Sequence, residues 1–112
     1  MGFFRRRTKP QELPLGSGES QVDRMMVEKM PVFLSKLHSE HPPRWVTVHA
    51  DRLESVTGFE SPEYMAEATN HEVWSVSHFV GDFPFVRGFL NEVQPGQTAR
   101  FDDVSGKYTL DD

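Results

Sequence analysis

The sequence predicts an α+β fold, in which an N-terminal kinked helix packs on a small antiparallel sheet of hairpins and an extended arm precedes both. A helix-start pattern stands at Ser20, strand-like segments and turn residues fill the second half, and helices before a run of strands are typical of this class. The 112 residues suit one domain. We therefore expect an arm over residues 1–19 and a single domain over residues 20–112.

The predicted helix covers residues 20–40. Ser20 and Asp23 resemble a capping box, in which each side chain satisfies a free backbone N–H of the first helical turn. One apolar face follows at three- and four-residue spacing: Val22, Met26, Met30, Phe33 and Leu37. Pro31 removes a backbone donor, so the helix should bend there.

Three shorter elements are expected next. Apolar and polar residues alternate over residues 44–50, which predicts a strand. Asp51 and Glu54 resemble a second capping box, which predicts a short helix over residues 51–58. A serine, a proline and a glutamate in succession then begin a helix over residues 61–70.

A β-hairpin is expected over the aromatic-rich segment that follows. Residues 71–80 and 83–93 are strand-like, and Gly81-Asp82 between them suits a two-residue turn. Such a turn fixes the register and places Trp74 opposite Phe89 on one side of the sheet.

The last elements are a turn and a second hairpin. Pro95-Gly96 is a turn pair, and residues 98–104 and 107–110 are expected to pair around Ser105-Gly106. The predicted sheet therefore consists of antiparallel strands only.

The charge is divided unevenly along the chain. The formal net charge is −5, but residues 1–10 contain four Lys/Arg and no acid (+4), whereas residues 11–112 contain eight Lys/Arg and seventeen Asp/Glu (−9). A body this acidic repels nucleic acid and anionic lipid, so a nucleic-acid partner is not expected.

Two candidate contact sites follow from these patterns. The arm carries a basic and aromatic tip: Phe3, Phe4, Arg5, Arg6 and Arg7. This tip suits a disordered tail, a membrane-surface anchor or a dock on a protein neighbour, and the charge split favours an acidic protein surface. The predicted hairpin face adds Trp74, Arg87 and Phe89, and aromatic residues and arginine dominate interface hot spots.

The chemistry-bearing residues do not form a catalytic, metal or cofactor motif. His38 and His41 lie three residues apart but lack a third ligand at a readable spacing. His49 and Asp51 share one strand face, yet Asp51 is better explained as a helix cap. His78 falls on the apolar face of the predicted hairpin, where a partly buried, hydrogen-bonded histidine is expected.

These observations favour a non-enzymatic structural subunit of a larger multi-chain particle, such as a virion, that uses its arm and a sheet face for protein contacts. One alternative is a cytoplasmic membrane adaptor anchored by the arm, and another is a small ligand-binding or enzymatic domain using His49 or His78. The chain has no cysteine, no apolar segment follows the arginines, and a run of 18 apolar residues is lacking. We therefore expect neither a signal peptide nor a transmembrane helix, and a location in the cytoplasm or in a particle assembled there.

Overall fold

The computed structural model describes residues 20–111, and these form four α-helices and one six-stranded sheet. The predicted α+β class is confirmed. The predictions for the arm over residues 1–19 lie outside the described residues.

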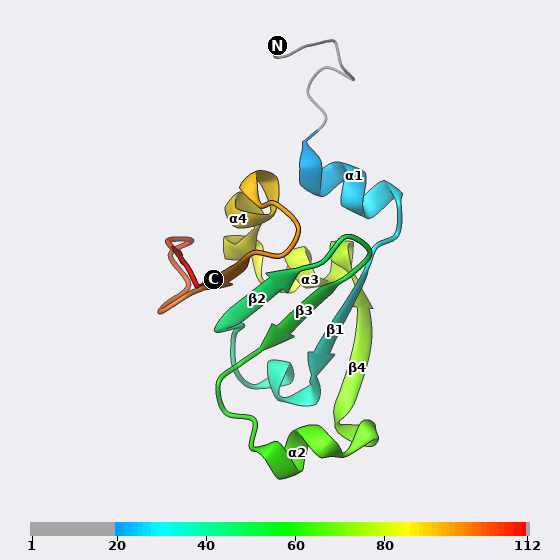
Figure 1. Ribbon diagram of the computed structural model, residues 1–112, viewed down its shortest axis with the longest axis vertical. Helices are drawn as coiled ribbons and strands as arrows, with labels where there is room; N and C mark the ends of the chain where they lie inside the picture. Colours follow the sequence, from blue (N-terminus) through cyan, green and yellow to red (C-terminus); the bar gives the residue numbers. More distant parts are fainter. Residues whose placement is uncertain (1–19, 112) are drawn as a thin grey trace.

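The sheet contains six short strands, and α- or 3₁₀-helices lie in the β1–β2, β3–β4 and β4–β5 connections (Figure 1). The strands are β1 (Pro31–Ser35), β2 (Trp45–Val48), β3 (Leu53–Val56), β4 (His71–Ser75), β5 (Thr98–Arg100) and β6 (Thr109–Leu110). The α-helices are α1 (Gln21–Val27), α2 (Pro62–Ala66), α3 (Val76–Asp82) and α4 (Arg87–Glu92). Three 3₁₀ turns are η1 (Lys36–Ser39), η2 (Ala68–Asn70) and η3 (Pro84–Val86).

The strand order is β4-β1-β3-β2-β5-β6, so β4 and β6 form the two edges. β1 and β3 pair in parallel, and the other neighbours pair antiparallel. The sheet is therefore mixed, which corrects the all-antiparallel prediction. The predicted strand over residues 44–50 is confirmed as β2, and the last predicted hairpin is confirmed in a shorter form as β5 and β6.

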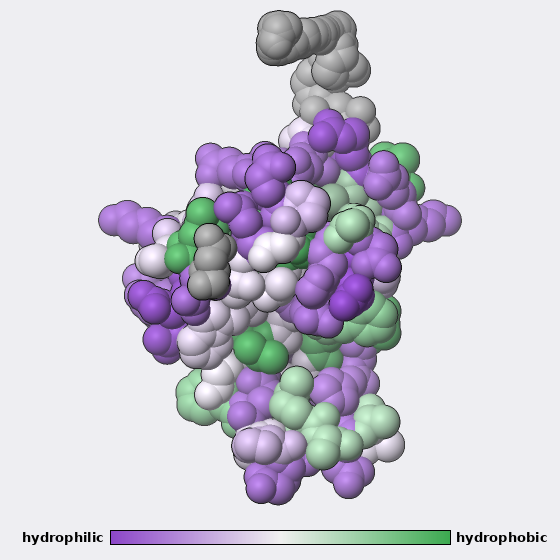
Figure 2. Space-filling view, viewed as in Figure 1, coloured by the Kyte–Doolittle hydropathy of each residue, from purple (hydrophilic) through white to green (hydrophobic). Residues whose placement is uncertain are grey.

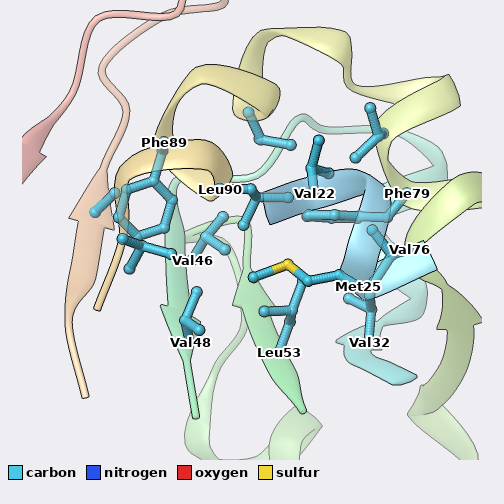
Figure 3. Packing of buried hydrophobic residues seen from close by; sticks show 14 of the residues in the cluster. Val22, Met25, Val32, Val46, Val48, Leu53, Val76, Phe79, Phe89 and Leu90 are labelled. Carbon is cyan, nitrogen blue, oxygen red and sulfur yellow. The ribbon is translucent and has the colours of Figure 1, made fainter. Parts of the chain in front are cut away.

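One face of the sheet packs against α1, α3 and α4 and forms the core (Figure 3). Side chains alternate along each strand, so Val32, Val46 and Leu53 point into this layer and are fully buried. Phe79 and Phe89 reach them from α3 and α4. In Figure 1 the strands β1, β2 and β3 pass in front of α3, and this nearer side of the sheet carries none of these three helices.

The predicted kinked helix over residues 20–40 is wrong beyond its first two turns. The capping box is present, with Ser20 Oγ accepting from the Asp23 N–H and the Asp23 carboxylate accepting from the Ser20 N–H. The helix ends at Val27, and Lys29 then takes the left-handed conformation at φ 58°. Pro31 is the first residue of β1, a position where a strand accepts proline.

The predicted helix over residues 51–58 is also wrong, because residues 53–56 form β3. Asp51 pairs with its neighbour Arg52 instead of capping a helix. The next helix start is confirmed, since Ser61 Oγ accepts from the Tyr64 N–H and α2 begins at the proline between them. That helix ends at Ala66, and η2 covers the rest of the expected span.

The predicted hairpin over residues 71–93 is wrong after its first strand. Ser75 ends β4 and caps α3, its Oγ accepting from the His78 N–H at 3.0 Å. Val76, Phe79 and Val80 then recur at helical spacing and are buried. The expected turn residues Gly81-Asp82 lie inside α3, and η3 and α4 replace the expected returning strand.

Candidate interaction surfaces

Strand β4 is an edge strand whose outer side carries no partner. It pairs with β1 on one side only. Among the described residues, the His71 N–H donates to the Ala68 carbonyl oxygen, and no backbone-to-backbone hydrogen bond reaches residues 72–74 from outside the sheet. An edge of this kind presents a row of free N–H and C=O groups that another strand can pair with. Nothing lies beyond β4 at the right of Figure 1.

The helix-free face of the sheet is apolar next to this edge. Val73 at the centre of β4 is 60% exposed, and its partner on β1, Phe33, is 42% exposed. Met65 of α2 is 37% exposed and lies near Phe33 at one end of the same face. Figure 2 shows hydrophobic residues gathered over the lower half of the molecule among hydrophilic ones. The next residue in the row, Glu54 on β3, ends the apolar patch.

The structure separates the hairpin residues predicted to share one face. Trp74 stacks on His78 at 3.8 Å between ring centroids and donates to Glu72. Arg87 is exposed at the start of α4 and pairs with Asp23 of α1. Phe89 is fully buried in the core, so it offers no surface. The tip residues Phe3, Phe4, Arg5, Arg6 and Arg7 lie outside the described residues.

A second candidate surface is an open hollow of about 750 Å³. Residues from η1 and the segment after it, from the corner between α3 and η3, and from the loop before β6 enclose it. Its apolar wall is formed by Phe83, Phe85 and Val104 with two prolines, and Glu40 and Asp82 add carboxylates. The residues that line it include no lysine or arginine.

His38 lies at the base of this hollow and is held from both ring nitrogens. Its Nδ1 lies 2.9 Å from the Ser35 carbonyl oxygen, which can only accept, so Nδ1 carries the proton. Nε2 is therefore free to accept from the Ser55 hydroxyl at 2.8 Å. Burial lowers the pKa of His38 below its usual value of 6.5 despite the opposing hydrogen bond to Ser35, so the ring is neutral at pH 7.

Glu60 ties the end of β1 to the loop after β3. Its carboxylate accepts from the Ser35 hydroxyl, from the Thr57 N–H and hydroxyl, and from the Gly58 N–H. Partial burial raises the pKa of Glu60, but these hydrogen bonds outweigh burial and lower the pKa from 4.5 to about 2. Glu60 is therefore ionised in the folded protein at neutral pH.

The contacts of Ser55, His38 and Ser35 resemble a nucleophile, a base and an orienting acceptor. Ser55 is only 4% exposed, however, and it does not line the hollow. A substrate in the hollow would not reach its hydroxyl. We conclude that this arrangement satisfies buried polar groups and braces the sheet.

The other histidines do not meet as a site. His49 pairs with Glu54 at 3.1 Å, while Asp51 pairs with Arg52, so the expected base and orienter are not in contact. His41 stacks on Phe59 at 4.0 Å between ring centroids. His78 is half exposed rather than enclosed by an apolar face. Within residues 20–111, no group of three or more His, Asp or Glu side chains is placed to hold a metal ion.

Sequence reasoning missed the residues that form both surfaces. Phe33 was assigned to the buried face of a helix, and Val73 was placed in a strand, as observed, but was not identified as a contact residue. The exposure of both depends on strand order, which no local pattern reveals. His38 was expected near the end of the predicted helix, whereas it is buried and hydrogen-bonded to Ser35 and Ser55. The one sequence feature that could have placed Phe33 outside the core was its position between Val32 and Leu34. In a strand, this alternation puts Phe33 on the opposite face from its two neighbours.

Known proteins give no match to this chain, whether family models, curated proteins or solved structures are compared. Within residues 20–111, every helix is too short or too polar to cross a membrane.

Proposed function

We propose that the protein is a non-enzymatic assembly subunit that pairs with a second copy of itself through the edge strand β4. The observation that carries this proposal is the free outer side of β4, with exposed Val73 at its centre. Natural edges are usually blunted by lysine, proline, a bulge or a very short strand. Residues 71–75, with the sequence HEVWS, contain neither lysine nor proline.

The sequence of β4 is compatible with pairing to itself. In an antiparallel pair centred on Val73, Glu72 faces the partner's Trp74 and His71 faces the partner's Ser75. No like charges then oppose one another. Moving the centre to Glu72 would set two carboxylates face to face, which is destabilising. The charge pattern therefore favours the register centred on Val73 over the register centred on Glu72.

This register also extends the apolar patch across the two copies. Phe33 lies beside Val73 within each copy, so four apolar side chains would form one row over four strands. Cross-strand pairs of this type contribute about 0.2–1 kcal/mol each. The Glu54 side chains would bound the row at both ends. The backbone hydrogen bonds and this row together supply the association energy.

A two-fold β4 contact closes a dimer and leaves no β4 edge free, so a larger particle needs a second contact. The proposed second contact uses the exposed Arg87 and the partly buried Trp74.

The test uses a cysteine at the centre of the proposed interface. The natural chain has no cysteine, so a disulfide formed by Val73→Cys reports only on this position. Opposed residues in an antiparallel pair have Cα atoms about 4.5–5.5 Å apart, within the range of a disulfide. Mild oxidation should therefore convert the variant to a covalent dimer, and light scattering should find the wild type dimeric.

The matched control is Leu110→Cys, because Leu110 is 46% exposed on β6, which is the opposite edge of the sheet from β4. It should cross-link slowly, by random collision. Equal rates for the two variants, or a wild type that stays monomeric at its highest soluble concentration, would refute the β4 dimer.

A further inference from the structure

We propose that the hollow beside His38 is a socket for the arginine- and phenylalanine-rich tip, residues 3–7, of the same polypeptide. This inference does not depend on the β4 dimer, because the hollow and the edge strand are formed by different residues. The hollow is the binding site, and its ligand is an aromatic segment that carries guanidinium groups.

The size of the hollow suits several side chains. Binding sites of about 300–1,000 Å³ bury most of a small ligand, and this hollow measures about 750 Å³. It is also assembled from three segments that are distant in the sequence, which only the folded body brings together. The site is thus a property of the fold and not of one loop.

The lining matches aromatic and cationic side chains together. Phe83 and Phe85 offer ring faces and edges that suit both phenylalanine and guanidinium groups. Among the described residues, Glu40 has no ion-pair partner, and the ion pair of Asp82 is with His78. His38 is neutral, since burial lowers its pKa, so it does not repel a cation. The hollow is lined by carboxylates and aromatic rings and by no lysine or arginine. Such a lining favours a segment that carries basic and aromatic side chains.

The chain itself contains such a segment. Residues 3–7 contain two phenylalanines and three arginines. Residues 8–19 connect them to the body and span up to roughly 40 Å when extended. The described body measures 47 × 25 × 22 Å, so this reach exceeds its two shorter dimensions.

Attachment in the same chain also makes a weak contact sufficient. A tether of this length gives an effective concentration on the order of millimolar. Exposed ion pairs contribute about 0–1 kcal/mol each, so burial of Phe3 or Phe4 against Phe83 and Phe85 has to supply most of the affinity. A millimolar affinity would already occupy the socket in about half of the molecules.

The experiment places a nitroxide spin label at Thr8→Cys in the full chain, where no natural cysteine competes. The amide signals of His41, Phe85 and Val104 should broaden, whereas those of α2 should not. Labelled protein without ¹⁵N, mixed with unlabelled ¹⁵N protein, should cause no broadening if the contact is within one chain. Uniform broadening over the surface, no broadening, or broadening in the mixed sample would overturn the proposal.

Two sets of variants test the chemistry of the contact. Phe3→Ser with Phe4→Ser should abolish the broadening, whereas Leu13→Ser with Leu15→Ser changes the same number of apolar residues in the linker and should preserve it. Glu40→Lys should reduce the broadening, and adding Arg6→Glu should restore it. The control Glu67→Lys reverses an exposed acid after α2 and should have no effect. Broadening that survives the phenylalanine changes, or responds equally to both glutamate changes, would refute the assignment.

Discussion

The two edges of the sheet are built in different ways. Strand β4 has five residues, all paired with β1, and its outer side is free and apolar at Val73. Strand β6 has two residues and pairs with β5 only at Ala99 and Arg100. The β6 edge is instead stabilised by an aromatic cluster next to it, in which the ring centroids of Tyr108 and Phe89 lie 5.1 Å apart.

This difference shows how one sheet can direct association to one side. A two-residue strand offers too few backbone groups to be a template for another chain, and natural proteins use such short strands to blunt edges. A five-residue edge strand with an exposed valine can pair with a strand of another molecule. The β6 edge is therefore expected to be inert, while the β4 edge is expected to bind.

The largest effect on stability is expected from the aromatic cluster behind β6. Phe101 is 2% exposed and packs against Phe85, Phe89 and Tyr108. Replacing it with alanine should cost about 3–5 kcal/mol through lost burial and a cavity. Urea unfolding measures this loss. The β4 contact should survive under native conditions, and a Phe101→Ala variant that stays folded but loses the dimer would contradict the separation of the two edges.

Placing a lysine at one edge or at the other should distinguish the roles of β4 and β6 in association. Val73→Lys would place two ammonium groups face to face at the two-fold axis and should weaken the dimer by about tenfold or more, equivalent to about 1.4 kcal/mol. Leu110→Lys makes the same chemical change at β6, where the side chain is 46% exposed. Sedimentation equilibrium should show no change for this control. Equal weakening by both variants would indicate a general charge effect.

The stabilisation that the Glu60 carboxylate gives to the end of β1, beside β4, should depend on pH. Hydrogen bonds, opposed by burial, lower the pKa of Glu60 from 4.5 to about 2, so its stabilisation is complete above pH 4.5 and is lost as the pH falls toward 2. Solvent screening reduces the contribution to about 1–2 kcal/mol. Glu60→Gln should lose this amount at pH 7 and show a flatter stability profile between pH 4.5 and 2. Parallel profiles for variant and wild type would exclude this role.

The smallest effect is expected at a surface hydrogen bond near β6. The hydrogen bond to Glu92, together with slight burial and the charge of that carboxylate, raises the pKa of Tyr108 above 10.0. Tyr108→Phe removes the hydroxyl and should cost less than about 1 kcal/mol. Spectroscopic titration of the wild type should show one tyrosine titrating late, and Glu92→Gln should move it back. An unchanged titration would place the hydroxyl away from Glu92.

Local capping signals in the sequence were predictive, because they depend on neighbours only three residues apart. Ser20 with Asp23 and Ser61 before α2 both cap as expected. The strand over residues 44–50 was also predictable, since its alternation between buried and partly exposed positions persists in β2.

Longer patterns failed where two periods fit the same residues. Met26, Met30 and Phe33 match a helical spacing, yet the strand at Pro31 interrupts it and Phe33 points away from the core. Val76, Phe79 and Val80 fit a helix, but a turn pair at Gly81-Asp82 favoured a hairpin instead. Pairing partners decide between such alternatives, and the parallel contact of β1 with β3 is not encoded in any local segment.

The candidate surfaces were less predictable than the fold class. Trp74, Arg87 and Phe89 were grouped on one face of a predicted hairpin that does not form. Trp74 is partly buried, Arg87 is exposed and Phe89 is fully buried. Edge exposure follows from the order of strands, so Val73 could not be distinguished from Val76 before the topology was known.

The place of β1 between β4 and β3 also bears on the order of folding. Residues 36–70 separate β1 from β4, whereas residues 49–52 alone join β2 to β3, and a longer loop costs more entropy to close. We therefore expect the β2–β3 hairpin to form early and β4 to dock late. During that interval the flank of β1 is vacant, and β4 of another molecule fits it as well as its own. Refolding at high concentration should then yield molecules that have exchanged β4 and that separate only through unfolding.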